Sequence, residues 1–238
     1  MMKLCVIGDP VGHSLSPMLH REMLQKAGIA GQYEAVTVKA GKLADFVKKA
    51  KDGAYDGFNV TMPHKESIIP LLDELTPSAQ AMGAVNTVVV RQGRAIGYNT
   101  DGDGLVRSLP QLPRKAVVLG NGGAAKAVSR ALRQSGVEVV ICARHPAQGE
   151  LPWNKIDDAA KDCGLLVNAT CLGMTGKEQF ADFDFLRHLP ENAAVYDLVY
   201  EPRKTELLRQ AEMLCHPVIE GFALLKSQAE LAFNIFTT

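Results

Sequence analysis

The sequence predicts an α/β protein composed of two α/β domains, the second of which contains a doubly wound parallel sheet. Three observations support this class. Short apolar segments alternate with amphipathic ones along most of the chain, which is typical of βαβ units. The segment Ser108–Arg114 contains two prolines and separates two different patterns of elements. The length of 238 residues fits one large domain or two modest ones with buried cores.

Composition excludes several other classes. Hydrophobic residues make up 47% and charged residues 22%, which is typical of a globular chain and not of a disordered one. The 26 basic and 26 acidic residues balance, which argues against a nucleic-acid partner. No apolar run reaches the roughly 18 residues that a membrane span needs. The five cysteines are odd in number and have no CxxC spacing, so we expect reduced thiols in a cytoplasmic protein and no metal site. We further expect a monomer or homodimer.

The first part of the chain alternates strands with short helices. Apolar segments between turn residues predict the strands Lys3–Gly8, Tyr33–Val38, Phe58–Thr61, Thr87–Arg91 and Ala95–Tyr98. The predicted helices run from Ser16-Pro17 to Gly28, over Leu43–Lys51, over Lys65–Leu72 with a kink at Pro70, and from Thr76-Pro77 to Gly83. We expect Ser16 to cap the first helix with its hydroxyl, and Gln92-Gly93 to form the turn of a β-hairpin.

The second part follows a βαβ pattern. The predicted strands are Lys115–Leu119, Val137–Ala143, Leu165–Asn168 and Ala194–Val199, and the predicted helices are Ala124–Ser135 and Phe222–Thr238. We place the domain boundary after Asp101. The first domain is expected to comprise residues 1–101 and the final helix 222–238, and the second to comprise residues 102–221.

A glycine-rich turn joins the first strand and helix of the second part. Residues 120–125, GNGGAA, fit the pattern G-x-G-x-x-A, in which the glycines permit a tight turn and a close approach to a pyrophosphate. A P-loop is excluded because alanine stands at 125 and 127. The next strand ends in Ala143-Arg144-His145, where an NAD site would carry an acidic residue. Arg144 can instead pair with a 2′-phosphate, which favours NADP.

Polar residues gather where strands of the first domain end. Ser14 and Ser16 precede a helix, where two hydroxyls form a good carboxylate cradle, although helix capping alone also explains them. Asn59 and Thr61 alternate along one strand face, and Lys65 follows after a proline-containing turn. Asn86 opens the hairpin, and His64 is expected to be exposed.

Two further features need a partner or an explanation. Gln228 lies on an otherwise apolar helix face, so its amide must bind either protein or ligand. Residues 97–104, GYNTDGDG, match the first half of a calcium-binding loop, but Pro110 occupies the position of its last carboxylate. A helix-capping turn is the remaining interpretation of that segment.

Eight segments together resemble one enzyme family. They are GDPVGHSLSPMLH, GFNVTMPHK, GAVNTV, GYNTDGDG, GNGGAA, NATCLGM, DLVYEPRKTELL and EGFALLKSQAELAF. In this order they resemble the shikimate dehydrogenases, NADP-dependent oxidoreductases of aromatic amino-acid biosynthesis. The resemblance covers essentially the whole chain. It implies an N-terminal substrate domain, a C-terminal Rossmann-type NADP domain, and an active site in the cleft between them.

The resemblance also implies roles for individual residues. Lys65 and Asp101 would be the catalytic pair. The substrate ligands would be Ser14 and Ser16 for the carboxylate, Asn59, Thr61, Asn86 and Gln228 for ring hydroxyls, and Tyr200 nearby. The cofactor ligands would be Gly120, Asn121, Gly122, Gly123, Ala124, Arg144, Asn168, Thr170, Met174 and Gly221. Alanine and histidine flank Arg144 where the family commonly has asparagine and threonine, and the segment between that strand and Asp197 is shorter than usual.

The implied reaction is the reversible reduction of 3-dehydroshikimate to shikimate by hydride transfer. Lys65 would donate or accept the proton, and Asp101 would orient Lys65 and the reacting hydroxyl. Two alternatives remain. One is a quinate/shikimate dehydrogenase with broader substrate or cofactor use, and the other is a catalytically silent protein that binds NADP or shikimate.

Overall fold

The computed structural model describes residues 1–238 and divides into two compact units. The first unit comprises Met1–Asp101 and Gln228–Thr238, and the second comprises Gly102–Ser227. The last helix, α9 (Gly221–Thr237), therefore contributes its first residues to the second unit, whereas the sequence interpretation gave the whole helix to the first. No helix is long and apolar enough to cross a membrane.

The first unit contains a mixed six-stranded sheet in the order β2-β1-β3-β5-β6-β4. Its strands are β1 (Met2–Gly8), β2 (Gly31–Thr37), β3 (Gly57–Val60), β4 (Glu74–Leu75), β5 (Thr87–Arg91) and β6 (Arg94–Tyr98). β1 pairs in parallel with β2 and β3, and β5 runs antiparallel to β3 and β6. The carboxyl ends of β1, β3 and β6 therefore meet the amino end of β5 at one edge of the sheet.

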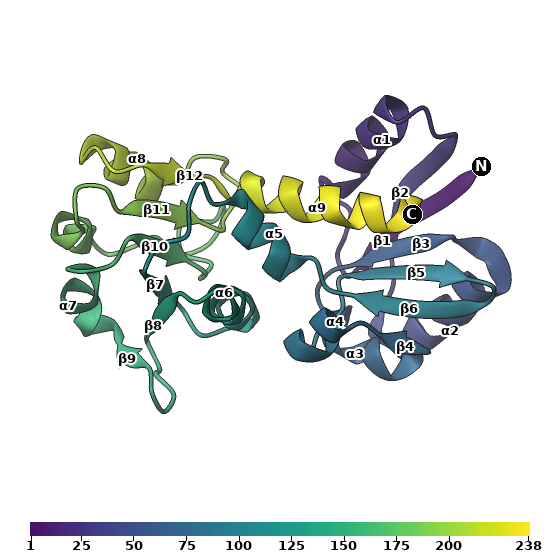
Figure 1. The fold of residues 1–238 in the computed structure, drawn as a ribbon, viewed down its shortest axis with the longest axis horizontal. Coiled ribbons are helices and arrows are strands. Elements are labelled where there is room, and N and C mark those ends of the chain that lie inside the picture. The colour runs from purple at the N-terminus through teal and green to yellow at the C-terminus, as the bar shows by residue number, and fades with distance from the viewer. The chain divides into compact units, whose positions relative to one another are not determined.

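Helices cover both faces of this sheet. They are α1 (Ser16–Lys26), α2 (Leu43–Lys49), α3 (His64–Ser67), α4 (Pro77–Met82) and the C-terminal part of α9. On one face, Leu24 of α1 and Phe233 of α9 pack with Leu4 and Tyr33. On the other face, α2 packs on β1 and β3 (Figure 1). This double cover explains why β3 is buried along its whole length.

The second unit contains an all-parallel six-stranded sheet in the order β12-β11-β10-β7-β8-β9. The strands are β7 (Lys115–Leu119), β8 (Glu138–Ala143), β9 (Leu151–Pro152), β10 (Leu165–Asn168), β11 (Ala194–Asp197) and β12 (Val218–Ile219). The helices are α5 (Asp101–Ser108), α6 (Gly123–Gln134), α7 (Ile156–Ala160) and α8 (Glu206–Met213). This is the doubly wound parallel sheet that the sequence predicts.

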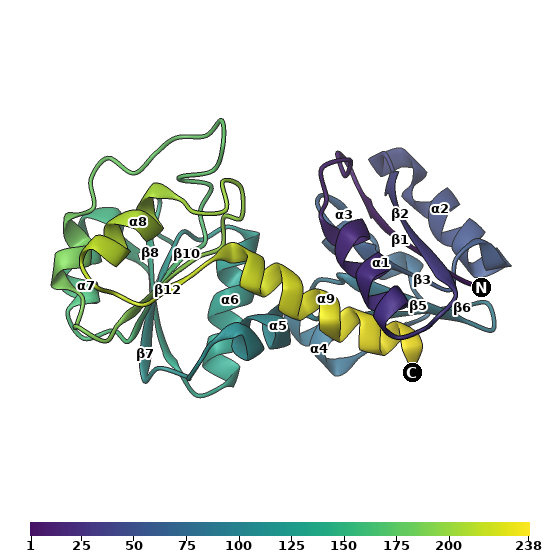
Figure 2. The ribbon, with the colours of Figure 1, turned by 90° about the horizontal axis from the view of Figure 1, so that it is seen from above.

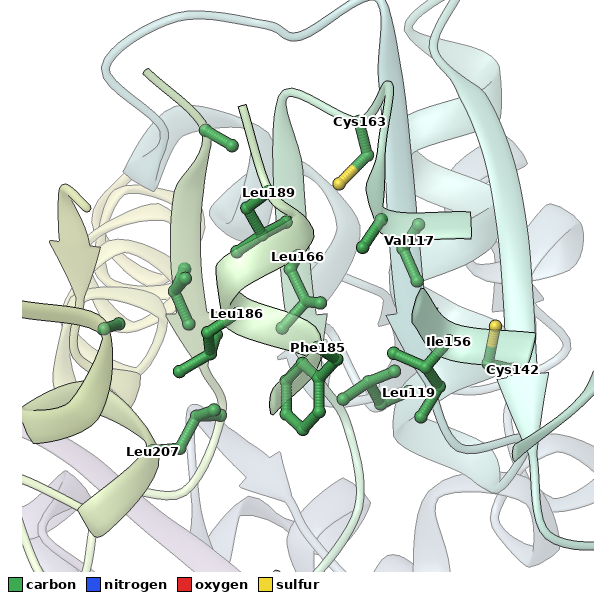
Figure 3. Packing of buried hydrophobic residues seen from close by; sticks show 14 of the residues in the cluster. Val117, Leu119, Cys142, Ile156, Cys163, Leu166, Phe185, Leu186, Leu189 and Leu207 are labelled. Atoms are coloured by element: carbon green, nitrogen blue, oxygen red, sulfur yellow. The ribbon is translucent and has the colours of Figure 1, made fainter. Parts of the chain in front are cut away.

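Alternating strand residues face two separate cores in this unit. Figure 2 shows α6 on one side of the sheet and α7 and α8 on the other. Val117 and Leu166 point toward α7 and α8, as Figure 3 shows, while Val118 and Val167 contact α6. The strands therefore consist of nearly continuous apolar runs, as expected for a parallel sheet with both faces covered.

Several local expectations are corrected by the structure. The N-cap of α1 is Leu15, and Ser16 is the first helical residue, because the Ser14 hydroxyl already accepts a hydrogen bond from the Ser16 N–H at 3.3 Å. The helix expected over Lys65–Leu72 is two short pieces, α3 and a 3₁₀ turn at Ile69–Leu71. His64 is buried and contacts the Val38 carbonyl through Nε2, so it is not exposed as expected.

Candidate active site

The polar residues of the first unit converge at the sheet edge defined above. Thr61 follows β3, Asn86 precedes β5, and Asp101 comes three residues after β6. Main-chain bonds hold these segments together, because the Val60 N–H donates to the Asn86 carbonyl at 2.8 Å. The Val85 N–H likewise donates to the Lys65 carbonyl at 2.8 Å. Fold topology thus places residues from three separate sequence motifs side by side.

Lys65 and Asp101 form a close ion pair. Lys65 Nζ donates to Asp101 Oδ2 at 2.6 Å, and both side chains remain partly exposed. The second carboxylate oxygen, Oδ1, accepts from Asn86 Nδ2 at 2.8 Å. The Asp101 N–H donates to Asn99 Oδ1 at 3.0 Å, so the GYNTDGDG segment is the helix-capping turn at the start of α5. Asp101 is therefore fixed from both its backbone and its side chain.

Asn59 lies deeper in the sheet than its motif suggests. Its side chain is only 6% exposed. The Asn59 amide donates to the Asn86 carbonyl at 3.1 Å and to Thr87 Oγ1 at 3.0 Å, and its Oδ1 accepts from the Tyr33 hydroxyl at 2.6 Å. Both amide hydrogens are used within the protein. Asn59 thus holds the main chain of Asn86 in place and has no N–H left to donate to a bound molecule.

Tyr33 and His20 lie at the buried end of the hydrogen-bond network around Asn59. The Tyr33 ring is fully buried, and burial raises the pKa of its hydroxyl well above the usual value. His20 stacks on Tyr33 with 4.3 Å between ring centroids. Burial lowers the pKa of His20 to about 3, so its imidazole is neutral near pH 7.

The predicted carboxylate cradle lies on the loop after β1. Ser14 is half-buried and Ser16 is buried at the start of α1. The same edge carries Thr61, whose N–H donates to the Ile7 carbonyl at 2.9 Å. Gly8 permits this approach, since a Cβ there would stand 2.5 Å from the Thr61 methyl carbon and 2.9 Å from the Met62 carbonyl oxygen.

Gln228 reaches the same network through its main chain. The Thr100 hydroxyl donates to the Gln228 carbonyl at 3.1 Å. Thr100 also accepts from Asn86 Nδ2 at 2.9 Å. Gln228, the first residue of the last segment of the first unit, is therefore hydrogen-bonded to Thr100. Thr100 in turn connects it through Asn86 to Asp101.

The glycine-rich turn of the second unit has the geometry of a pyrophosphate site. Gly120 has a φ of +100°, and a Cβ there would lie 2.8 Å from the Thr170 methyl carbon. Gly122 is the N-cap of α6, and no side chain caps this helix. A Cβ on Gly122 or Gly123 would meet no protein atom within 4 Å. The packing of the protein therefore does not require glycine at these two positions, whereas close approach of a pyrophosphate requires it at 122, the second glycine of the pattern.

The turn is held to the loop after β8 by Asn121. Its Nδ2 donates to the His145 carbonyl and to Glu150 Oε2, both at 2.9 Å. Glu150 also accepts from the Ala147 N–H, and these hydrogen bonds lower the pKa of its carboxyl group. Arg144 is exposed at the end of β8 and donates to Glu178 Oε2 at 2.9 Å.

Asn168 is buried at the end of β10 and acts as a support. It donates to Asp197 Oδ1 at 2.9 Å and to the Leu172 carbonyl at 3.1 Å. Its Oδ1 accepts from Thr170 Oγ1 at 2.6 Å. Asp197 is fully buried, its second oxygen accepts from the Thr205 hydroxyl, and desolvation raises the pKa of its carboxyl group. Asn168 therefore shapes the loop that carries Thr170 and Met174, and both of its amide hydrogens are used.

Two remaining candidates flank the end of β11. Tyr200 is exposed three residues after the strand. Gly221 begins α9, and a Cβ there would stand 2.6 Å from the Leu198 carbonyl oxygen. Glycine at 221 is thus required for close packing of the helix start against this loop.

Sequence reasoning missed the residues that support the site. Tyr33, Thr87 and Thr100 belong to the network under Asp101, and Asp197 holds Asn168. One signal was available. A tyrosine between polar residues in an otherwise partly exposed strand needs a partner for its hydroxyl.

A large cavity lies elsewhere in the second unit. It has a volume of about 720 Å³ and is lined by residues at the amino ends of the strands, including Lys115, Gly164 and Ala194. Ligands of open α/β sheets bind at the carboxyl ends of the strands. The cavity contains none of the predicted site residues.

The fold and these sites are those of an oxidoreductase that uses a dinucleotide. The chain belongs to the shikimate dehydrogenase family. Residues 6–88 match the family model of the shikimate dehydrogenase substrate-binding domain. An NADP⁺-dependent shikimate dehydrogenase of Methylocella silvestris is 40% identical over 247 residues, which cover 96% of this chain and 88% of the relative.

Two solved structures support the same assignment. The shikimate 5-dehydrogenase of Thermus thermophilus in complex with NADP(H) and shikimate is 36% identical, with a TM-score of 0.88 over 100% of this chain and 94% of the other. The enzyme of Listeria monocytogenes, in complex with shikimate and NAD, is 30% identical, with a TM-score of 0.89 over 100% and 92%.

Proposed function

We propose that this chain is an NADP-dependent shikimate dehydrogenase that interconverts 3-dehydroshikimate and shikimate. In the reducing direction, 3-dehydroshikimate, NADPH and a proton give shikimate and NADP⁺. The observation that carries this proposal is the Lys65–Asp101 pair at 2.6 Å, fixed by Asn86 within the motifs of the family.

Lys65 supplies the proton in this scheme. The bound nicotinamide provides the hydride, and negative charge then develops on the carbonyl oxygen of the substrate. The Lys65 ammonium group donates a proton to that oxygen and accepts it back in the reverse direction. Asp101 keeps Nζ in place and accepts a hydrogen bond from the substrate hydroxyl. Assistance of this kind contributes about 10²–10⁴-fold to the rate.

The first unit is the substrate domain in this proposal. Ser14 and Ser16 bind the carboxylate, while Thr61 and Gln228 of this unit and Tyr200 of the second unit contact the ring substituents. Asn59 and Asn86 are assigned positioning roles, because the amide hydrogens of both are committed to protein atoms, those of Asn59 to the Asn86 carbonyl and Thr87 and those of Asn86 to Thr100 and Asp101.

The second unit binds NADP. The unobstructed space over Gly122 and Gly123 and the uncapped start of α6 fit a pyrophosphate. The other residues proposed along the cofactor are Gly120, Asn121, Ala124, Thr170, Met174 and Gly221, with Asn168 supporting their loop. Arg144 is exposed and forms the only guanidinium contact proposed for the 2′-phosphate.

Broader use of quinate or NAD is the alternative that the same residues could serve. Relatives have been solved with each dinucleotide, the Thermus thermophilus enzyme with NADP(H) and the Listeria monocytogenes enzyme with NAD. We expect a small-molecule enzyme of the cytoplasm, where the exposed thiols of Cys171 and Cys215 stay reduced. A monomer or homodimer is proposed for its assembly.

Replacing Lys65 by alanine tests the catalytic assignment. Shikimate-dependent reduction of NADP⁺ should fall by about two to four decades, while NADP⁺ binding stays unchanged. Lys51→Ala is the matched control, because Lys51 pairs with Asp73 at 2.7 Å and its side chain is 30% exposed against 36% for Lys65. The assignment fails if Lys65→Ala retains the wild-type rate. Quinate and NAD⁺, assayed in parallel, measure how broad the specificity is.

A further inference from the structure

We infer that Glu178 sets the preference for NADP over NAD by competing with the 2′-phosphate for Arg144. The inference rests on the proposed function, in which Arg144 binds that phosphate. It starts from the hydrogen bond of 2.9 Å between Arg144 Nη1 and Glu178 Oε2.

The ion pair connects the two loops on either side of the glycine-rich turn. Arg144 follows β8, and Glu178 lies on the loop after β10. β8 and β10 are the two neighbours of β7, the strand that leads into the turn. Dinucleotides bind in this fold at the carboxyl ends of these strands, with the ribose that carries the 2′-phosphate near the end of the second one. The carboxylate of Glu178 thus already accepts a hydrogen bond from the guanidinium group that would bind the 2′-phosphate.

Main-chain hydrogen bonds fix the position of Glu178. Its carbonyl accepts from the Gly173 N–H at 2.9 Å, and the Lys177 N–H donates to the Met174 carbonyl at 3.0 Å. The Thr175 N–H donates to the Glu201 carbonyl at 3.0 Å, which ties the same loop to the segment after β11. The backbone therefore presents this carboxylate to Arg144 without depending on the ion pair itself.

The neighbours of Arg144 give a phosphate little other support. Ala143 and His145 flank it, and the His145 carbonyl accepts from Asn121. The nearest acidic group on the same loop, Glu150, is held at the glycine-rich turn by Asn121 and is negatively charged at neutral pH. Among residues 143–145 the one permanent cation for a 2′-phosphate is thus Arg144, which is already paired.

Binding of NADP and binding of NAD affect the Arg144–Glu178 ion pair differently. When NADP binds, its 2′-phosphate must displace the Glu178 carboxylate from Arg144. The affinity for NADP is therefore lowered by the free energy of the Arg144–Glu178 ion pair. NAD has no phosphate at this position and leaves the pair intact. Both side chains are well exposed, at 61% and 73%, so the pair is of the weak, solvent-screened kind. Its loss should tighten NADP binding by about two- to fivefold.

The test is calorimetric titration of NADP⁺ and NAD⁺ with purified variants, which measures dissociation constants without turnover. Glu178→Gln should lower the Kd for NADP⁺ by about two- to fivefold and leave the Kd for NAD⁺ unchanged. Glu212→Gln is the matched control, because Glu212 also forms a half-exposed ion pair, with Lys204, on α8 of the same unit. It should leave both constants unchanged.

The double variant separates competition from simple charge repulsion. In an Arg144→Ala background, Glu178→Gln should have no effect on NADP⁺ binding, since the contested guanidinium is gone. The same gain in that background, equal gains for both cofactors, or no gain in the single variant would each overturn the inference. Arg144→Ala alone tests the proposed function, which requires that NADP⁺ binding weaken far more than NAD⁺ binding.

Discussion

Replacing His20 by phenylalanine should remove much of the acid sensitivity of the first unit. His20 is 1% exposed, stacks on Tyr33 and lies near Phe233 and Phe236. Its Nδ1 has no hydrogen-bond partner. Phenylalanine keeps the stacking and removes both the unsatisfied nitrogen and the titration, so the variant should fold with near-wild-type stability at pH 7.5.

The direction of the pH effect follows from the lowered pKa. The unfolded chain takes up a proton at His20 near pH 6.5, while the folded protein does so only at about pH 3. As pH falls below 6.5, the unfolded state is therefore stabilised and the folded state is not. The loss amounts to about 1.4 kcal/mol per pH unit, or about 2 kcal/mol between pH 6.5 and 5.

Between pH 6.5 and 5, the change in folding stability comes mainly from histidine and not from most carboxylates. The carboxyl groups with lowered pKa, such as Asp73 and Glu150, have ordinary values of 3.8 and 4.5 and lose their contribution mainly below pH 5. Thermal unfolding at pH 7.5 and 5.0 should show a fall in Tm that is smaller in His20→Phe than in wild type, by roughly 10 °C for a unit of about one hundred residues.

The two units can be followed separately because the only tryptophan, Trp153, lies in the second. Trp153 fluorescence follows the second unit, and far-UV circular dichroism follows both units, so a transition seen by circular dichroism alone reports the first unit. His13→Gln, at an exposed position of the first unit, is the control and should keep the wild-type pH response. Identical losses of Tm in wild type and His20→Phe would refute the argument.

Three further predictions concern the site. Tyr33→Phe leaves the buried Asn59 Oδ1 without its donor and should destabilise the first unit by about 1–3 kcal/mol in urea unfolding, with a fall in kcat of less than tenfold; unchanged stability would contradict the network. Gln228→Leu should raise the KM for shikimate by about tenfold, and an unchanged KM would contradict a contact between its amide and the substrate. Gly122→Ala should cost at most about 1 kcal/mol of stability but weaken NADP⁺ binding tenfold or more in calorimetry, and normal binding would remove the pyrophosphate from this turn.

Local features with a strict backbone requirement were predictable from the sequence. The hairpin turn at Gln92-Gly93 has φ values of 51° and 75°, which is the geometry that a two-residue connection between twisted strands demands. Thr76 caps α4 with its hydroxyl, and Gly83 ends that helix in the left-handed conformation. Each of these features depends on residues close together in the chain.

Features that depend on tertiary pairing were not predictable. Ser16 was expected to cap α1, but Ser14 folds back onto the Ser16 N–H and shifts the helix start. The two-residue strands β4, β9 and β12 are too short to show a period and exist because a neighbouring strand pairs with them. The pairing of Arg144 with Glu178 joins residues 34 positions apart, and no sequence pattern indicates it.

The depth of a polar residue along its strand decides whether it contacts a ligand or supports one that does. Asn59 and Thr61 lie on one side of the same strand, but two residues span about 6–7 Å, so Asn59 is buried while Thr61 is half-buried at the edge. Asn168 and Thr170 repeat this arrangement at the end of β10. In both units the asparagine uses both amide hydrogens to hold neighbouring segments together. A motif that includes both positions cannot distinguish these roles, because alternation gives the face of a side chain and not its distance from the sheet edge. We therefore propose that Thr61 contacts the substrate and that Asn59 and Asn168 position neighbouring segments, whereas the Thr170 hydroxyl is itself bonded to Asn168 Oδ1 and the Leu172 N–H.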